Sequence, residues 1–356
     1  MNIARCGWPL GLLLVLANAV AATPALPLEL LGATVAPGSM RALKLRVGDS
    51  FAGDALATPV LVAHGTESGP TVCLTAAIHG DELNGIEVVR RVLHEINPAV
   101  LKGTVIGVPV VNLLGFTQGS RHTPDRRDLN RFFPGRPTGN YANRLAHQLF
   151  SQLIEPHCTY LIDLHTGSFK RANLPQLRAD LTNPAVRRLA ASFGTTPILR
   201  KRGNARMLRR VASERGIPSV SLEFGEATTV QTKHVDDVVA GLRVALGQLG
   251  LLSRLPAPQS RQLVYARSFW IRAPQGGVFM SRKALGDSIL KGDILGTIVN
   301  PLTDARREIT APDAGRILGM ASDQFVLPGY GVYDVGRPVE AAPEKASKVP
   351  GPGTLE

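Results

Sequence analysis

Apolar and polar residues follow two different periods along the chain from about residue 58 onward. Continuous apolar runs predict buried strands at residues 71–78, 103–111, 159–164 and 217–224. Apolar residues spaced three and four positions apart predict helices at residues 83–96, 141–154, 184–193 and 235–252. Apolar strands that alternate with helices are typical of an α/β domain with a mixed, mostly parallel sheet covered by helices.

The pattern changes after Leu252, and residues 256–258 are expected to form a linker. Residues 263–336 combine short β-like runs with frequent Gly and Pro, which predicts a small all-β C-terminal domain. The α/β domain then comprises residues 22–255. Residues 338–356 are rich in Pro, Ala, Lys and Glu and lack periodicity, so we expect a disordered tail.

Residues 1–21 have the three parts of a secretory signal peptide: Arg5 near the start, an apolar run, and the small residues Ala19 and Ala21. The apolar run is shorter than the roughly 20 residues that a spanning helix needs. Cleavage after Ala21 would give a periplasmic or secreted protein without a membrane span. An uncleaved anchor is the alternative interpretation.

Three cysteines are present, and Cys6 belongs to the expected signal peptide. Cys73 and Cys158 are left, each a few residues before a histidine in or beside an expected strand. An oxidising compartment permits a disulfide between them if the two strands are neighbours. Two separate buried thiols are the alternative.

The composition is that of an ordinary globular protein, since 44% of the 356 residues are hydrophobic and 19% are charged. A formal net charge of +12 raises the question of a nucleic-acid partner. However, the cations are spread along the chain, and aromatic residues that could stack on bases make up only 5%. We therefore expect no nucleic-acid partner and interpret the excess as a basic surface that attracts anionic substrates.

Two polar clusters follow the first and third expected strands, where ligands bind in open α/β sheets. His79 and Glu82 lie three residues apart in one cluster, and His165 lies in the other. Two histidines and one glutamate are the ligand set of a catalytic zinc site that keeps one position for water. The sequence therefore predicts one Zn²⁺ per chain at these residues. Asp163 shares a strand face with His165 and either orients that ligand or is structural.

A third cluster ends the fourth expected strand and contains Glu223 within an apolar stretch. Burying an unpaired carboxylate is costly, so its position indicates a function. Near the zinc ligands, Glu223 can act as general base toward water and then as acid toward a leaving amine. Glu226 is the rival candidate and is expected to be exposed, just past the strand.

A loop rich in arginine, residues 120–135 with Arg136 beside it, lies between the first two clusters. Arginine binds carboxylates bidentately and stabilises a developing oxyanion, so the loop is interpreted as an anion-binding segment. A solvated charged loop is the alternative, which suits Arg126 and Arg136. It does not suit Asn130 and Arg131, which lie between apolar residues.

Four stretches, in this order, make the chain resemble the succinylglutamate desuccinylase/aspartoacylase family, a branch of the zinc-carboxypeptidase (M14-like) fold. They are HGDELNG (79–85), SRHTPDRRDLNRFFPG (120–135), DLHTGSFKRANLPQLR (163–178) and LEFG (222–225). The resemblance covers roughly residues 55–336. It implies that residues 22–255 form a zinc-carboxypeptidase-like catalytic domain and that residues 263–336 correspond to the family's second domain.

The resemblance also implies roles for individual residues. His79, Glu82 and His165 would hold zinc, Glu223 would be the general base, and Arg121 would polarise the scissile carbonyl. Substrate contacts would come from Asn130, Arg131 and Arg178, with Asp128 supporting the loop. His122 and Glu226 depart from the residues common in the family, so its acyl specificity does not carry over.

These expectations describe a secreted or periplasmic zinc-dependent amidohydrolase. Its substrate would be an N-acyl amino acid or a small peptide that bears a carboxylate. Two alternatives stay open: a metallocarboxypeptidase acting on peptidoglycan peptides, and a non-catalytic binding protein on the same scaffold. A binding protein has no need of a general base, so Glu223 speaks against the second.

Overall fold

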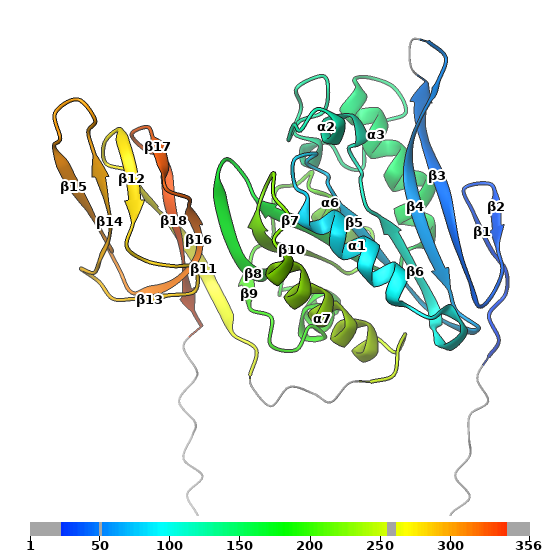
Figure 1. The fold of residues 1–356 in the computed structure, drawn as a ribbon. Coiled ribbons are helices and arrows are strands. Elements are labelled where there is room, and N and C mark those ends of the chain that lie inside the picture. The colour runs from blue at the N-terminus through cyan, green and yellow to red at the C-terminus, as the bar shows by residue number, and fades with distance from the viewer. Residues whose placement is uncertain (1–22, 50–51, 255–260, 340–356) are drawn as a thin grey trace, which may run out of the picture.

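The computed structural model describes residues 23–49, 52–254 and 261–339. The expected signal peptide, the linker at 256–258 and all but the first two residues of the expected tail lie outside these ranges. A twelve-stranded sheet forms the body of the molecule, and a four-stranded sheet lies beside it (Figure 1). A small antiparallel pair, β1 (Leu28–Leu30) and β2 (Ala33–Val35), precedes both.

The centre of the large sheet is parallel. Its strands, in spatial order, are β6 (Lys102–Val108), β5 (Glu67–Ala76), β7 (Tyr160–Gly167) and β10 (Ser219–Glu226). All four were expected from their apolar runs. However, β7 and β10 continue past those runs, so that His165 lies inside a strand instead of just beyond it. Glu223 lies inside β10, within the strand that was expected there.

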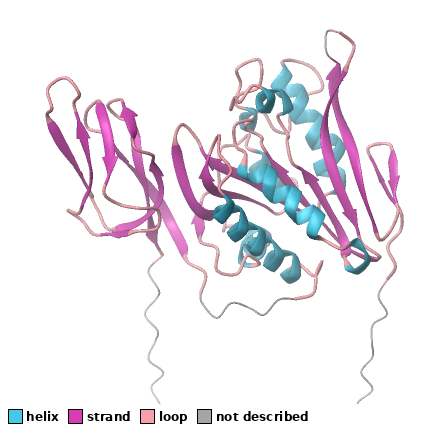
Figure 2. Cartoon of the chain, in the orientation of Figure 1, coloured by secondary structure: helices cyan, strands magenta, loops and turns pink. Residues whose placement is uncertain are grey.

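Helices cover both faces of this centre (Figure 2). Strand residues such as Leu74 and Ile162 pack against α1 (Asn84–Glu95), α5 (Pro184–Ala191) and α7 (Thr232–Gln248). Their sequence neighbours, such as Cys73 and Leu161, belong to a second core with α3 (Tyr141–Leu149) and α6 (Leu208–Glu214). This alternation follows from the two-residue period of a strand.

Shorter helical segments complete the connections. They are η1 (Pro98–Val100), α2 (Leu113–Thr117), η2 (Leu129–Arg131), the π-helical η3 (Phe150–Ile154) and α4 (Glu155–His157). The helix expected at 141–154 is therefore α-helical only to Leu149 and continues as a π-turn. Among the described residues, no helix has the length and apolar character required to cross a membrane.

Antiparallel ladders flank the parallel centre on both sides, so the sheet is mixed and the expected mostly parallel character is not confirmed. On one side, β4 (Ala55–His64) pairs with β6 and with β3 (Ser39–Asp49). On the other, β8 (Arg171–Ala179) runs antiparallel to β10 and pairs with the short β9 (Ile198–Arg200). In β3, buried and exposed residues alternate, so a search for continuous apolar runs passes over it.

The strands expected within residues 263–336 are present, but only part of them forms a separate sheet. The large sheet continues through β11 (Val264–Arg272), β18 (Gly331–Pro338), β16 (Gly315–Ala321) and β13 (Ser288–Ile289). The four-stranded sheet contains β15 (Arg306–Thr310), β14 (Ile294–Val299), β12 (Gly277–Ser281) and β17 (Gln324–Val326). Since β11 pairs with β9 and β16 with β8, the C-terminal strands extend the same sheet that carries Glu223.

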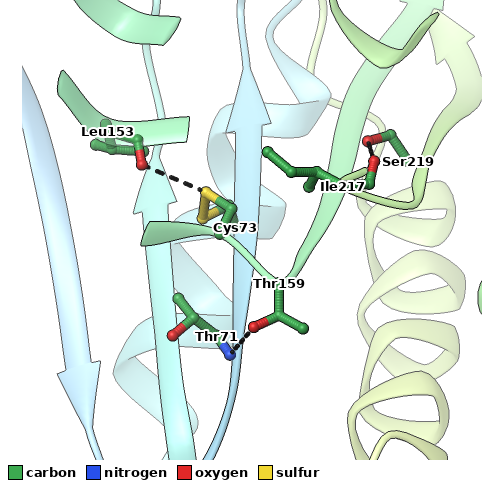
Figure 3. Close-up of a disulfide and its surroundings, with 7 residues drawn as sticks. Thr71, Cys73, Leu153, Thr159, Ile217 and Ser219 are labelled. Atoms are coloured by element: carbon green, nitrogen blue, oxygen red, sulfur yellow. Dashed lines mark hydrogen bonds between the residues drawn. A yellow bond between two sulfur atoms is a disulfide. The ribbon is translucent and has the colours of Figure 1, made fainter. Parts of the chain in front are cut away.

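A disulfide joins Cys73 on β5 to Cys158, just before β7 (Figure 3). The two Cα atoms lie 5.7 Å apart because β5 and β7 are neighbours in the sheet. Both cysteines are buried in the second core. Of the two interpretations that the sequence allowed, the disulfide is the one confirmed.

Candidate metal centre and active site

The chain turns sharply after β5, and this turn carries two of the expected metal ligands. Ala77 adopts a left-handed conformation, with φ of 48°. Gly80 passes so close to α2 that a Cβ atom there would lie 2.2 Å from the backbone of Gly115. Only glycine fits this approach, which sets His79 and Glu82 over the end of the sheet.

His79, Glu82 and His165 come together in a buried cluster whose candidate donor atoms all lie within 4.8 Å of one another. His79 Nδ1 is 2.8 Å from Glu82 Oε1, and His165 Nδ1 is 2.9 Å from Glu82 Oε2. The backbone N–H of Thr166 also donates to Glu82 Oε2, at 3.2 Å. The two imidazoles thus approach one carboxylate from different segments, His79 from the turn after β5 and His165 from β7.

The far side of each imidazole faces an aspartate. His79 Nε2 lies 3.1 Å from Asp128 Oδ1, and His165 Nε2 lies 2.7 Å from Asp163 Oδ2. Asp163 also accepts a hydrogen bond of 2.8 Å from Thr75 Oγ1. A carboxylate partner keeps the proton on Nε2 and leaves Nδ1 as the metal-binding atom. The donor set and its orientation therefore fit a zinc ion.

The pKa values of this cluster depend on one another. Burial would lower the pKa of His79 and of His165, but nearby carboxylates raise both, and that of His165 lies well above its usual range. Burial opposes ionisation of Glu82 and Asp128, yet His79 and the other facing cations hold their pKa values far below the ordinary range. Metal binding here therefore competes with protons for the imidazole nitrogens.

Arg121 reaches the same cluster from the arginine-rich loop. Its Nη1 donates to Glu82 Oε1 at 3.1 Å, and its Nη2 donates to Asp128 Oδ2 at 3.2 Å. Asp128 also accepts from the backbone N–H of Asn130, at the start of η2. Asp128 therefore links the loop backbone, Arg121 and His79.

Asn130 and Arg131 occupy different environments. The buried Asn130 places its Nδ2 3.2 Å from His165 Nε2, and its Oδ1 accepts from the backbone N–H of Leu208 at the start of α6. The Arg131 side chain is 44% exposed and donates from Nη1 to the carbonyl of Asn130. Asn130 thus contacts the candidate metal cluster, whereas Arg131 is the more exposed of the two residues.

Glu223 is buried and lies opposite His165 in the parallel register of β10 and β7. Its Oε1 lies 2.8 Å from Nη1 of Arg178, and its Oε2 accepts from Asn173 Nδ2 at 2.9 Å. Glu226 is partly buried and bonds to Gln231 and Ser322 instead, so it is not the exposed rival expected from the sequence.

Asn173 is a site residue to which sequence reasoning gave no role. It belongs to the third motif, but its strand, β8, was not predicted, so its neighbours were unknown. Gly319 of β16 lies beside it in register, and a Cβ there would come within 2.9 Å of Asn173 Oδ1. The polar residues within 171–179 were the signal that could have identified a strand at the site.

Comparison with known proteins supports the family resemblance that the four motifs indicated. The family model of the succinylglutamate desuccinylase/aspartoacylase catalytic domain matches residues 68–247, about half of the chain. N-alpha-acetyl-L-2,4-diaminobutyric acid deacetylase of Halomonas elongata is 29% identical over 269 residues, which cover 72% of this chain and 78% of that protein.

Solved structures share the fold. A succinylglutamate desuccinylase/aspartoacylase from Rhodobacter sphaeroides is 25% identical with a TM-score of 0.75, covering 84% of this chain and 95% of that one. The product-bound ectoine utilization protein EutE (DoeB) from Ruegeria pomeroyi is 24% identical with a TM-score of 0.75. The match covers 88% of this chain and 98% of that one. The chain therefore belongs to the succinylglutamate desuccinylase/aspartoacylase family, as its four ordered motifs predicted.

Proposed function

We propose that this protein is a zinc-dependent deacylase that hydrolyses the amide bond of an N-acyl amino acid. The observation that carries the proposal is Glu223, a buried carboxylate opposite His165 and beside the His79, Glu82 and His165 cluster. Membership of the family and the likeness to a curated deacetylase support the same reaction class.

Each residue of the site is proposed to have a different role in the reaction. His79, Glu82 and His165 would hold the ion, which when bound supplies a Lewis acid that activates water. Glu223 would take a proton from the attacking water and deliver it to the nitrogen of the breaking C–N bond. Arg178 and Asn173 fix the two oxygens of Glu223, so the carboxylate is oriented before substrate arrives.

Arg121 is placed to stabilise the charge that develops on the carbonyl oxygen. Its guanidinium lies beside the metal ligand Glu82, and its side chain is 15% exposed. A donor held in this way costs little reorganisation in the transition state. Asp128 keeps Arg121 in position.

The substrate is proposed to bear a carboxylate. Arg131, Asn130 and Arg178 supply donors around the metal centre, and a guanidinium binds a carboxylate with two parallel hydrogen bonds. Arg131 is the most exposed of the three, and a ligand carboxylate would compete with Asp128 and the Asn130 carbonyl for its guanidinium. This arrangement suits a small acylated amino acid or short peptide.

We further propose that the protein is exported to the periplasm or secreted. The pattern of residues 1–21 and the buried Cys73–Cys158 disulfide support this, because such disulfides persist in oxidising compartments. Cell fractionation with detection of the protein tests it, and finding the full-length chain in the cytoplasm would contradict it.

The deciding experiment is a screen of N-acyl amino acids and muropeptides with zinc-loaded protein, with release of free amine as the readout. We expect hydrolysis of an N-acyl amino acid by the wild type and at least about 100-fold slower hydrolysis by Glu223→Gln with the same zinc content. Cleavage of muropeptides alone would favour a carboxypeptidase. Ligand binding without amine release from any compound would favour a binding protein.

A further inference from the structure

Phe169 lies at the rim of the candidate active site with its ring over Arg121. The distance from Arg121 Cζ to the ring centroid is 5.7 Å, within the range of a cation–π contact. The side chain is nonetheless 59% exposed, although Phe is usually buried. Phe169 therefore covers one face of Arg121 and presents its other face outward.

The backbone of this loop is strained. Phe169 and Lys170 have φ values of 57° and 54°, so two successive L-residues adopt the left-handed conformation. This conformation is unfavourable for L-residues, and it persists only when the surroundings enforce it.

Residues of the C-terminal region hold Phe169 and Lys170 in this conformation through hydrogen bonds. The carbonyl of Phe169 accepts from the Tyr330 hydroxyl, and the carbonyl of Lys170 accepts from Ser322 N at 3.0 Å and Gln324 Nε2 at 2.8 Å. These contacts come from residues more than 150 positions later in the chain. The C-terminal region thus holds the loop that joins β7 to β8.

Arg171, the next residue, also contacts the C-terminal region. The guanidinium of Arg171 lies over the rings of Trp270, at 5.0 Å, and Tyr330, at 4.2 Å. Its Nε also donates to the carbonyl of Gly331 at 3.0 Å. Phe169 is therefore part of a fixed wall and not of a freely moving loop.

We propose that Phe169 borders the acyl subsite and selects substrates whose acyl group is apolar. The inference rests on the proposed function, in which Arg121 faces the scissile carbonyl. The acyl substituent is bonded to that same carbonyl carbon, so it lies beside the guanidinium and the ring that covers it.

The charges around Arg121 explain why the selected group is apolar. Nη1 and Nη2 of Arg121 already donate to the two carboxylates of Glu82 and Asp128, whose combined charge exceeds that of the guanidinium. A carboxylate on the acyl group would meet these two acidic residues and the electron-rich face of the Phe169 ring. An alkyl group would instead bury apolar surface against the ring.

The test compares amides of one amino acid that carry an acetyl, a butanoyl or a succinyl group. We expect the wild type to hydrolyse the acetyl and butanoyl amides with higher kcat/KM than the succinyl amide. Phe169→Ala is expected to lower kcat/KM for the butanoyl amide about tenfold, as for a lost apolar contact, and for the succinyl amide less than about threefold. Phe169→Leu keeps an apolar side chain and should restore most of the preference.

Leu302→Ala is the matched control, because Leu302 is 92% exposed in the turn between β14 and β15, away from the site. Zinc content and thermal unfolding show whether each variant is folded. A wild-type preference for succinyl, or an equal loss for all three amides in Phe169→Ala and Phe169→Leu, would overturn the inference alone. A wild type that hydrolyses no N-acyl amino acid would overturn the proposed function and this inference with it.

Discussion

Nη1 of Arg178 lies 2.8 Å from Oε1 of Glu223, so the proposed general base forms an ion pair across two antiparallel strands. Asn173, from the same strand as Arg178, binds the other carboxylate oxygen. Both partners come from β8, about 45 to 50 residues before Glu223 in the chain. The base is therefore oriented by a strand that the apolar pattern alone did not predict.

Replacing Glu223 by glutamine should abolish most turnover and leave zinc binding intact. The amide has almost the same shape but cannot take a proton from water, and general acid–base catalysis contributes about 10²- to 10⁴-fold to a rate. Steady-state amine release and zinc content per chain measure the two effects. Glu226→Gln is the matched control, since Glu226 bonds to Gln231 and Ser322. Normal turnover in Glu223→Gln would remove Glu223 from the mechanism.

Gly319→Ala should slow catalysis without contacting substrate. Its new Cβ would lie 2.9 Å from Asn173 Oδ1 and force that side chain to shift away from Glu223. We expect kcat to fall about tenfold, the equivalent of a lost hydrogen bond to a charged group, with a changed pH profile and unchanged zinc content.

The control is Gly276→Ala, where the new Cβ would meet only ordinary contacts near 3.5 Å. Asn173→Ala should show the same loss, and the double variant should be no worse than either single one because both changes act on one hydrogen bond. Additive losses would indicate that Gly319 acts elsewhere.

Asp163→Asn should weaken zinc binding. Asp163 is 2.7 Å from His165 Nε2 and keeps the proton on that nitrogen, so its loss frees the imidazole to rotate or change tautomer. Removing such a partner typically costs 10- to 100-fold in metal affinity. Competition against a chromophoric chelator measures the dissociation constant. Asp237→Asn, at an exposed ion pair with Lys233, should leave the constant unchanged.

Replacing both Cys73 and Cys158 by serine should destabilise the protein by about 2–4 kcal/mol, the typical contribution of a disulfide. The bond closes a loop of sequence separation 85 and so restricts the unfolded chain. Chemical denaturation of the wild type and the variant gives the difference in their free energies of unfolding. Equal stability would show that the buried bond contributes nothing to folding.

Tyr333→Phe should be less stable than the wild type at pH 7 but not at high pH. The hydroxyl donates to the carbonyl of Leu295, a bond that contributes about 1 kcal/mol. Burial raises the pKa of Tyr333 to about 12. Since the unfolded pKa is about 10, the stability supplied by the neutral phenol is complete below pH 10 and declines as the pH rises toward 12.

The difference in the free energy of unfolding between wild type and Tyr333→Phe, measured at pH 8, 10 and 11.5, should therefore shrink and then change sign as the pH increases. Tyr160→Phe serves as the control for loss of a tyrosine hydroxyl elsewhere. A difference in unfolding free energy that stays constant from pH 8 to 11.5 would contradict the raised pKa of Tyr333.

Local pattern was sufficient for the parallel centre of the fold. The strands that became β5, β6, β7 and β10 are continuous apolar runs because both of their faces are buried, and this makes them visible without any partner. The same reasoning failed for β3, which alternates, and for β8, which carries polar residues toward the site. Reasoning from apolar patterns also placed the C-terminal strands in a separate domain. Backbone hydrogen bonds such as those between β11 and β9 do not depend on side-chain type, so the sequence pattern does not reveal them.

The sequence by itself determined the family and the group of His79, Glu82 and His165, because residue type and position at strand ends specify a donor set. It left open whether Cys73 and Cys158 pair, and it assigned Asn173 and Phe169 no role. Only the tertiary structure showed the disulfide and the contacts of Asn173 and Phe169. Each depends on the register of neighbouring strands and on contacts between residues far apart in the chain, which no local pattern encodes.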